Sequence, residues 1–197
     1  MIRCKNIHLS FNKVAVFSNF NLLVQQNENV CISGASGRGK SSLLHLLQGY
    51  IKPQNGQVII DREVLSPSTL KNIRNKIVYI PQNINLPVKN GNALVELLGI
   101  KNNSQQISSI LNQLGLSPDF MTKDFFKISG GQKQRIIIAI CLSIDKPIVL
   151  MDEPTASLDE ASIDLLIKTT RALKGKTIVS ASHNQSWAKS CQRIIEL

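Results

Sequence analysis

The stretch from Gly34 to Ser41 has the residue types and spacing of a phosphate-binding loop. It fits the pattern G-x-x-x-x-G-K-[ST], in which glycines let backbone N–H groups point at an anion and the following helix adds its positive dipole end. We expect Lys40 to meet the β- and γ-phosphates and Ser41 to offer its hydroxyl to Mg²⁺. For Arg38, a phosphate contact and a solvated position in the loop remain equally open. The candidate nucleotide-binding residues here are Gly34, Ala35, Ser36, Gly37, Arg38, Gly39, Lys40, Ser41 and Ser42.

Two adjacent carboxylates follow an apolar run in the second half of the chain. Residues 148–151 read Ile-Val-Leu-Met and are followed by Asp152 and Glu153. A buried strand of this kind delivers its last residues to the carboxyl edge of a sheet, where ligands bind in α/β folds. We expect Asp152 to hold Mg²⁺, directly or through water, and Glu153 to polarise the attacking water.

The elements that must position these residues alternate between strands and helices. Apolar runs predict strands over residues 28–33, 57–61, 76–80, 147–151 and 176–181, while helical patterns cover 41–48, 164–173, 184–191 and the stretch from 131 onward. Strands that are apolar on both faces and alternate with helices predict a parallel sheet covered on both sides. Residues 1–33 otherwise read as short strands and turns. Residues 83–128 are rich in Asn, Gln and Ser and carry two helical patterns, which we interpret as a small insertion.

Composition leaves three classes of partner open. The chain has 197 residues, with 23 basic against 13 acidic ones, and a net charge of +10. Such an excess suits nucleic acid, an anionic membrane surface or a phosphorylated ligand. The longest apolar run, residues 136–142, is far too short to span a bilayer, and the first residues resemble no signal peptide. Four widely separated cysteines predict reduced thiols and a cytoplasmic protein.

Six segments, in order, together resemble the nucleotide-binding subunit of ABC transporters. Besides the phosphate loop, residues 128–132 (Ile-Ser-Gly-Gly-Gln) are similar to the ABC signature, with Ile in place of the usual Leu. Residues 152–159 resemble a Walker B strand end continuing into a D-loop. Gln82, His183 and Phe11 stand where the family has its Q-loop glutamine, its switch histidine and an adenine-stacking aromatic residue.

The resemblance implies an α/β fold with a P-loop NTPase (RecA-like) core, an antiparallel β subdomain and a small α-helical insertion. The expected organisation is a single ABC ATPase domain over residues 1–197. Residues 1–82 and 129–197 form the nucleotide-binding core with its β subdomain, and residues 83–128 form the helical insertion.

The resemblance also implies roles for individual residues. In the family, two subunits form a head-to-tail homodimer that holds two ATP molecules, and the signature of one subunit closes on the ATP of the other. His183 would contact the γ-phosphate, Gln82 would reach Mg²⁺ or water, and Phe11 would stack on adenine. Asp159 would couple the two sites. The signature residues carried over are Ser129, Gly130, Gly131 and Gln132.

Three functions are compatible with these motifs. The first is an ATP-hydrolysing subunit that drives transport through a separate transmembrane permease, lies on the cytoplasmic face of the membrane and does not bind nucleic acid. The second is a non-transport ABC ATPase that acts on nucleic acid or the ribosome, which the positive charge could suggest. The third is a binding module without catalysis, against which Glu153 and His183 argue. The transported substrate and the direction of transport are not encoded in these motifs.

Overall fold

The computed structural model describes residues 1–83, 87–100 and 103–197, and contains two sheets. The five-stranded sheet is parallel, in the order β6-β7-β8-β3-β9. Its strands are β3 (Asn29–Ser33), β6 (Ile77–Ile80), β7 (Ile148–Asp152), β8 (Thr177–Ala181) and β9 (Arg193–Glu196). The four-stranded sheet is antiparallel, in the order β2-β1-β4-β5. Its strands are β1 (Ile2–Phe11), β2 (Val14–Val24), β4 (Asn55–Ile60) and β5 (Glu63–Val64).

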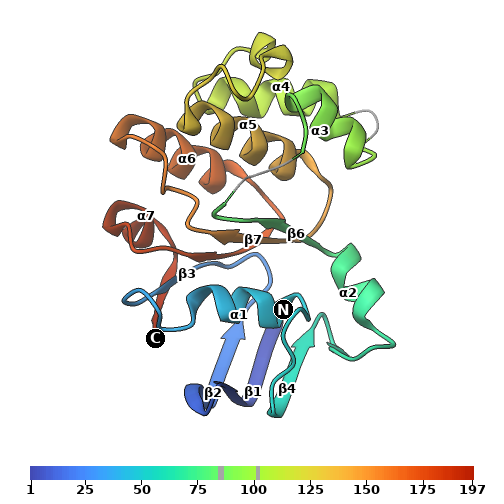
Figure 1. The fold of residues 1–197 in the computed structure, drawn as a ribbon, viewed down its shortest axis with the longest axis vertical. Coiled ribbons are helices and arrows are strands. Elements are labelled where there is room, and N and C mark those ends of the chain that lie inside the picture. The colour runs from blue at the N-terminus through green and yellow to red at the C-terminus, as the bar shows by residue number, and fades with distance from the viewer. Residues whose placement is uncertain (84–86, 101–102) are drawn as a thin grey trace.

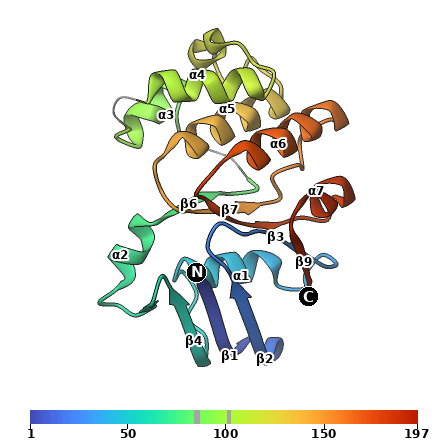
Figure 2. The same ribbon diagram turned by 180° about the vertical axis from the view of Figure 1, so that it is seen from behind.

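The helices form layers on either side of the parallel sheet (Figure 1). On one side α1 (Lys40–Leu47) lies between the two sheets, and on the other lie α5 (Gly130–Ser143) and α6 (Glu160–Ala172). Beyond them are α3 (Gly91–Leu97), α4 (Ser104–Gln113) and the short 3-10 helix η1 (Pro118–Thr122), while α7 (Gln185–Ser190) packs on β3 and α6. Seen from behind, α2 (Leu70–Asn75) and β9 lie on opposite sides of the molecule (Figure 2).

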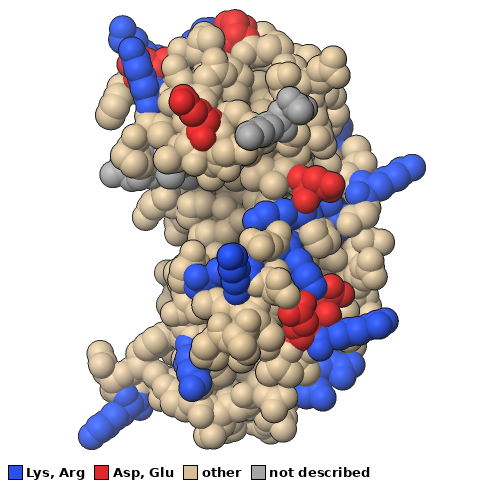
Figure 3. All heavy atoms as spheres, turned by 90° about the vertical axis from the view of Figure 1, so that its right-hand side faces the viewer, with Lys and Arg blue, Asp and Glu red and all other residues tan. Residues whose placement is uncertain are grey.

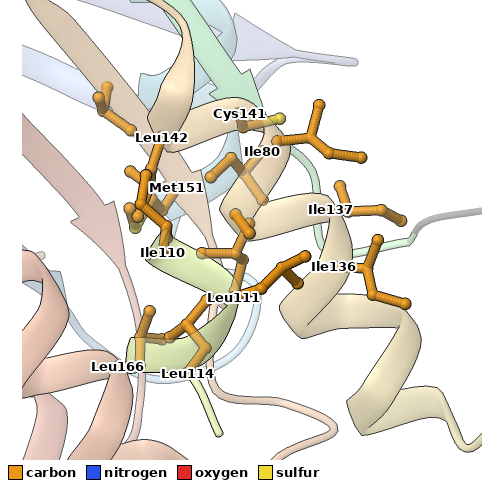
Figure 4. Close-up of a cluster of buried hydrophobic side chains, with 14 of the residues drawn as sticks. Ile80, Ile110, Leu111, Leu114, Ile136, Ile137, Cys141, Leu142, Met151 and Leu166 are labelled. Atoms are coloured by element: carbon orange, nitrogen blue, oxygen red, sulfur yellow. The ribbon is translucent and has the colours of Figure 1, made fainter. Parts of the chain in front are cut away.

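The side chains of the parallel strands alternate between two hydrophobic clusters, as the pleat of a strand requires. On β7, Val149 and Met151 join the cluster formed with α4, α5 and α6, whereas Ile148 and Leu150 join the cluster formed with α1 and the antiparallel sheet. Figure 4 shows the first cluster, in which Met151 meets side chains of α4 and α5. Burial on both faces explains why these strands are almost uniformly apolar.

The α/β fold class expected from the sequence is confirmed, and the expected strands and helices agree with the structure to within a few residues. The part of residues 1–33 that precedes β3 differs, because it forms two long strands, β1 and β2, rather than several short ones. Register shifts interrupt the β1–β2 pairing, and Asn6 and Asn19 adopt φ values of 49° and 56°. Such bulges break the regular alternation of apolar residues, so the sequence looks like shorter pieces. The described part of 83–128 contains α3, α4 and η1, but its limits as an insertion stay a prediction.

Candidate nucleotide-binding site

The phosphate-binding loop connects the end of β3 to the first turn of α1. Gly37 and Gly39 adopt φ values of 80° and 95°, a left-handed conformation that glycine adopts without steric cost. A side chain at Gly39 would also be blocked, because a Cβ atom there would lie 2.4 Å from Cγ1 of Val16. The buried Lys40 donates hydrogen bonds from Nζ to the carbonyls of Gly34 (2.8 Å) and Ala35 (3.1 Å). The loop therefore holds its ammonium group at the centre of the expected phosphate cradle.

A cavity of about 620 Å³ opens above this loop. Residues from four other regions meet there. Three of them follow strands of the parallel sheet, whose carboxyl ends share one edge with the loop, and the fourth is the end of β1 in the antiparallel sheet. The predicted site residues that line the cavity are Phe11, Gly34, Ala35, Ser36, Gly37, Gly39, Lys40, Ser41, Ser42, Gln82, Glu153 and His183. Phe11 is 45% exposed, so its ring has a face available at the cavity wall. Arg38 lines a neighbouring hollow with Phe17 and Glu196 instead.

The oxygen atoms expected to hold a metal ion lie next to the loop. Ser41 donates a hydrogen bond from Oγ to Oδ1 of Asp152 over 3.1 Å, and the hydroxyl of Tyr79 lies 3.4 Å from Oδ2. Burial raises the pKa of the Asp152 carboxyl above its ordinary value, so a cation beside it would favour its charged form. A hydroxyl and a carboxylate are ligands that Mg²⁺ prefers. These residues fit a magnesium ion shared with a bound phosphate.

Glu153 and His183 form a pair at the edge of the cavity. Oε2 of Glu153 lies 2.9 Å from Nδ1 of His183, and the two side chains are 9% and 71% exposed, respectively. The backbone of Glu153 has a φ of 48°, an uncommon conformation for this residue type that is often found at functional sites. Its N–H donates to the carbonyl of Ala181 over 2.8 Å. The carboxylate is therefore fixed at the cavity, whereas the imidazole is exposed.

The signature-like residues do not line this cavity. Ser129 accepts a hydrogen bond from the N–H of Gln132 (3.2 Å) and donates its own N–H to Oε1 of Gln132 (3.0 Å), forming a capping box at the start of α5. Ser129 and Gly130 are exposed. The start of α5 is thus a second exposed helix N-terminus, and its residues do not line the cavity of the same chain. Asp159, also exposed, caps α6 by accepting a hydrogen bond from the N–H of Ser162 (2.8 Å).

Two residues with contacts to the site were not identified from the sequence. Tyr79, on β6, reaches Asp152 with its hydroxyl. Gln134 lies on α5 and contacts the backbone of the segment that follows β7. Two sequence signals pointed toward Gln134: the stretch 133–135 after the signature-like residues also resembles the family, and the apolar run 136–142 follows directly. Neither signal gave Gln134 a role.

Comparisons with known proteins identify the family of the chain. The family described as ABC transporter matches residues 17–156. The chain is 32% identical to the energy-coupling factor transporter ATP-binding protein EcfA1 of Oenococcus oeni, covering 100% of this chain and 76% of the relative. It is 36% identical to the methionine import ATP-binding protein MetN of Legionella pneumophila, covering 98% of this chain and 61% of the relative. A dimeric ATP-binding cassette bound to ADP and Pi superposes with a TM-score of 0.84 at 30% identity, covering 100% and 94% of the two chains.

A phosphate-binding loop with a carboxylate beside it is the arrangement of an ATP-hydrolysing protein. The matches show to which family of ATP-hydrolysing proteins the chain belongs. The chain belongs to the ABC transporter family, as one of the ATP-binding and ATP-hydrolysing cassettes that power transport.

Proposed function

We propose that this chain binds and hydrolyses MgATP to drive transport through a separate transmembrane permease. The observation that carries the proposal is the meeting of Glu153 and His183 with the phosphate loop in one cavity. A binding module without catalysis would not need a buried carboxylate held in an uncommon backbone conformation at that position.

The residues at the cavity have distinct roles in this reaction. The N–H groups of the loop and the ammonium of Lys40 neutralise the phosphates as charge develops on them. The carboxylate of Glu153 accepts a proton from the water that attacks the γ-phosphorus, while the bond to ADP breaks. His183, held 2.9 Å from Glu153, orients that water and contacts the γ-phosphate. Ser41, Asp152 and Gln82 would hold Mg²⁺, which would supply positive charge to the phosphates.

The second helix start supports a head-to-tail homodimer with two ATP molecules. Ser129, Gly130, Gly131 and Gln132 lie at an exposed helix N-terminus, which favours anions. Because they do not line the cavity of their own chain, the ATP that they contact belongs to a second copy. Asp159, close to the same surface, would couple the two sites. Dimeric solved cassettes of 30–31% identity support this arrangement.

The relatives support a membrane partner and a location at the membrane. Relatives named for methionine import and for energy-coupling factor transport are ATP-binding proteins of transporters, so we place this chain on the cytoplasmic face beside a transmembrane permease. None of the helices in the described residues is long and apolar enough to cross a membrane. Residues 83–128 would form the insertion that docks on the permease.

Replacing Glu153 by Gln tests the catalytic assignment. The amide keeps the size of the side chain but cannot accept the proton, so we expect kcat for ATP hydrolysis to fall about 10²- to 10⁴-fold. ATP affinity should stay close to that of the wild type. The matched control is Glu160→Gln, since Glu160 is exposed in the first turn of α6. Near-normal turnover in Glu153→Gln would contradict the assignment.

The net charge of +10 is the one observation that favours nucleic acid instead. On the face in Figure 3, Lys and Arg side chains are scattered and interrupted by acidic ones, unlike a continuous binding stripe. ATPase rates measured with and without nucleic acid at two salt concentrations separate the two functions. Salt-sensitive stimulation by nucleic acid would contradict the transport assignment.

A further inference from the structure

Gln134 is a buried amide that bridges α5 to the backbone following β7. Its side chain is 4% exposed. Nε2 donates to the carbonyls of Pro154 (2.7 Å) and Glu153 (3.4 Å), and Oε1 accepts the N–H of Ser157 (3.2 Å). The carbonyls require a donor and the N–H requires an acceptor, so these partners fix the orientation of the amide.

The two segments that Gln134 joins carry different parts of the proposed reaction. At the start of α5, residues 129–132 form the helix start expected to meet the ATP of a second copy. Residues 153–159 begin with Glu153, which serves the ATP of its own chain. The two backbones also approach closely, because a Cβ atom on Gly131 would lie 2.6 Å from the carbonyl oxygen of Ser157. Only glycine allows this contact without displacing one of the segments.

The same bonds constrain the backbone of Glu153. Its φ of 48° is uncommon for a residue with a side chain, and such conformations persist only where neighbours determine them. The N–H of Glu153 is held by Ala181, and its carbonyl accepts bonds from the N–H of Ala156 (3.2 Å) and from Gln134. A shift of Gln134 would therefore move the carboxylate relative to the cavity.

We propose that Gln134 is a positioning residue that fixes the start of α5 against the segment from Glu153 to Asp159. Through these bonds, the nucleotide cavity of a subunit and the α5 start of the same subunit, which contacts the ATP of the other copy, move together. This inference rests on the proposed dimer function. It assigns no direct contact with ATP to Gln134, since the residue does not line the cavity.

The test compares steady-state ATPase kinetics of Gln134→Met and Gln134→Ala with the wild type. Met keeps nearly the same volume without the hydrogen bonds, whereas Ala removes both. We expect kcat to fall about tenfold to a hundredfold in both variants, while KM changes by less than about threefold because the phosphate loop is untouched. Gln113→Met, at an exposed glutamine of α4, is the matched control and should behave as the wild type.

Amide hydrogen exchange at Ser157 gives a second readout, because its N–H bonds to Oε1 of Gln134. We expect protection of this N–H in the wild type and its loss in Gln134→Met. If Gln134→Met does not fold, Gln134→Glu takes its place, since it keeps the side-chain length and an acceptor while its carboxylate lacks the two N–H donors; kcat should fall in that variant also.

Two results would overturn the proposal. A Gln134→Met variant with wild-type kcat, alongside an impaired Gln134→Ala, would show that only the volume of the side chain matters. A loss of ATP affinity as large as the loss of kcat would show that the substitution disturbs the phosphate-binding loop and not the position of Glu153. A wild-type chain without ATPase activity would instead refute the proposed function, and this inference with it.

Discussion

Glu153 and His183 differ in how firmly the protein holds them. Glu153 follows a buried strand and its backbone N–H donates to the carbonyl of Ala181, whereas the imidazole of His183 is 71% exposed. A base that must meet a water molecule in a defined position gains from being fixed. A histidine that contacts the γ-phosphate can instead move with the nucleotide. The pair thus combines a rigid proton acceptor with an accessible phosphate contact.

Glycine substitutions in the phosphate loop should have unequal effects. Gly39→Ala places a Cβ 2.4 Å from Cγ1 of Val16, whereas a Cβ at Gly37 meets nothing within 4 Å. Both residues have positive φ, so both substitutions carry the backbone cost of about 1 kcal/mol, and Gly39→Ala adds a steric clash. We expect Gly39→Ala to weaken ATP binding at least about tenfold more than Gly37→Ala. Titration with a fluorescent ATP analogue measures this, and equal affinities would contradict the account.

Single residues divide into those that a pattern reveals and those that only packing reveals. The phosphate loop, Asp152 and Glu153 were predictable because their chemistry demands fixed residue types at fixed spacing. Tyr79 and Gln134 were not, because their partners lie 73 and about 20 residues away along the chain. A lone sequence carries no signal for a hydrogen bond between such distant positions.

At the level of elements, the loop owes its position to the register of the parallel sheet. β3 pairs with β8 and with β9, so the loop after Ser33 emerges beside the ends of both strands. β8 pairs with β7 in turn, with Asp152 opposite Ala181. This pairing brings the carboxylates at the end of β7 and the histidine after β8 to one edge. The apolar runs in the sequence predicted that these strand ends share an edge. The order in which the strands pair could be seen only in the structure.

An ion pair between Glu28 and Arg193 links the edge strand β9 to the turn before β3. Arg193 Nε lies 2.7 Å from Oε1 of Glu28. Burial pushes the pKa of Glu28 upward, but hydrogen bonds from Arg193 and from the N–H of Gln25 outweigh it and bring the pKa below its ordinary value. A lowered acid pKa contributes stability above the unfolded-state value, and this contribution is lost as pH falls through the folded-state value.

Arg193→Met should therefore destabilise the protein in a pH-dependent way. We expect a loss of up to about 1 kcal/mol in the free energy of unfolding at neutral pH, limited by solvent screening of the half-exposed guanidinium. The difference from the wild type should shrink as pH falls below about 4. Urea unfolding between neutral and acidic pH measures it, with Lys168→Met, at an exposed lysine, as the control. A difference that does not change with pH would show that packing, not charge, is lost.

In the whole molecule, the parallel sheet separates two hydrophobic cores that support different parts of the proposed reaction. One core packs α1 and the antiparallel sheet beneath the phosphate loop, and the other packs α4, α5 and α6 behind the signature-like helix start. Figure 4 shows how side chains from α4, α5, β6 and β7 share the core behind the signature-like helix start. The fold class followed from the sequence because alternating strands and helices allow few topologies. The lengths of strands β1 and β2 could not be predicted from the sequence, because bulges interrupt the alternation of apolar and polar residues.

The central claim is that two copies join head to tail, with the helix start of each facing the ATP of the other. In a Glu153→Gln background, slow hydrolysis should preserve the ATP-bound state long enough to measure its mass and its bound nucleotide. The additional change Ser129→Arg places a bulky cation at the exposed start of α5 while leaving the phosphate loop intact. Light scattering with quantified nucleotide compares the two variants in MgATP.

We predict that Glu153→Gln forms a particle of twice the 21.8 kDa chain mass holding two ATP molecules. Glu153→Gln with Ser129→Arg should remain a monomer that still binds one ATP. An ATP-loaded monomer in the first variant, or a dimer that persists in the second, would contradict the shared-site arrangement.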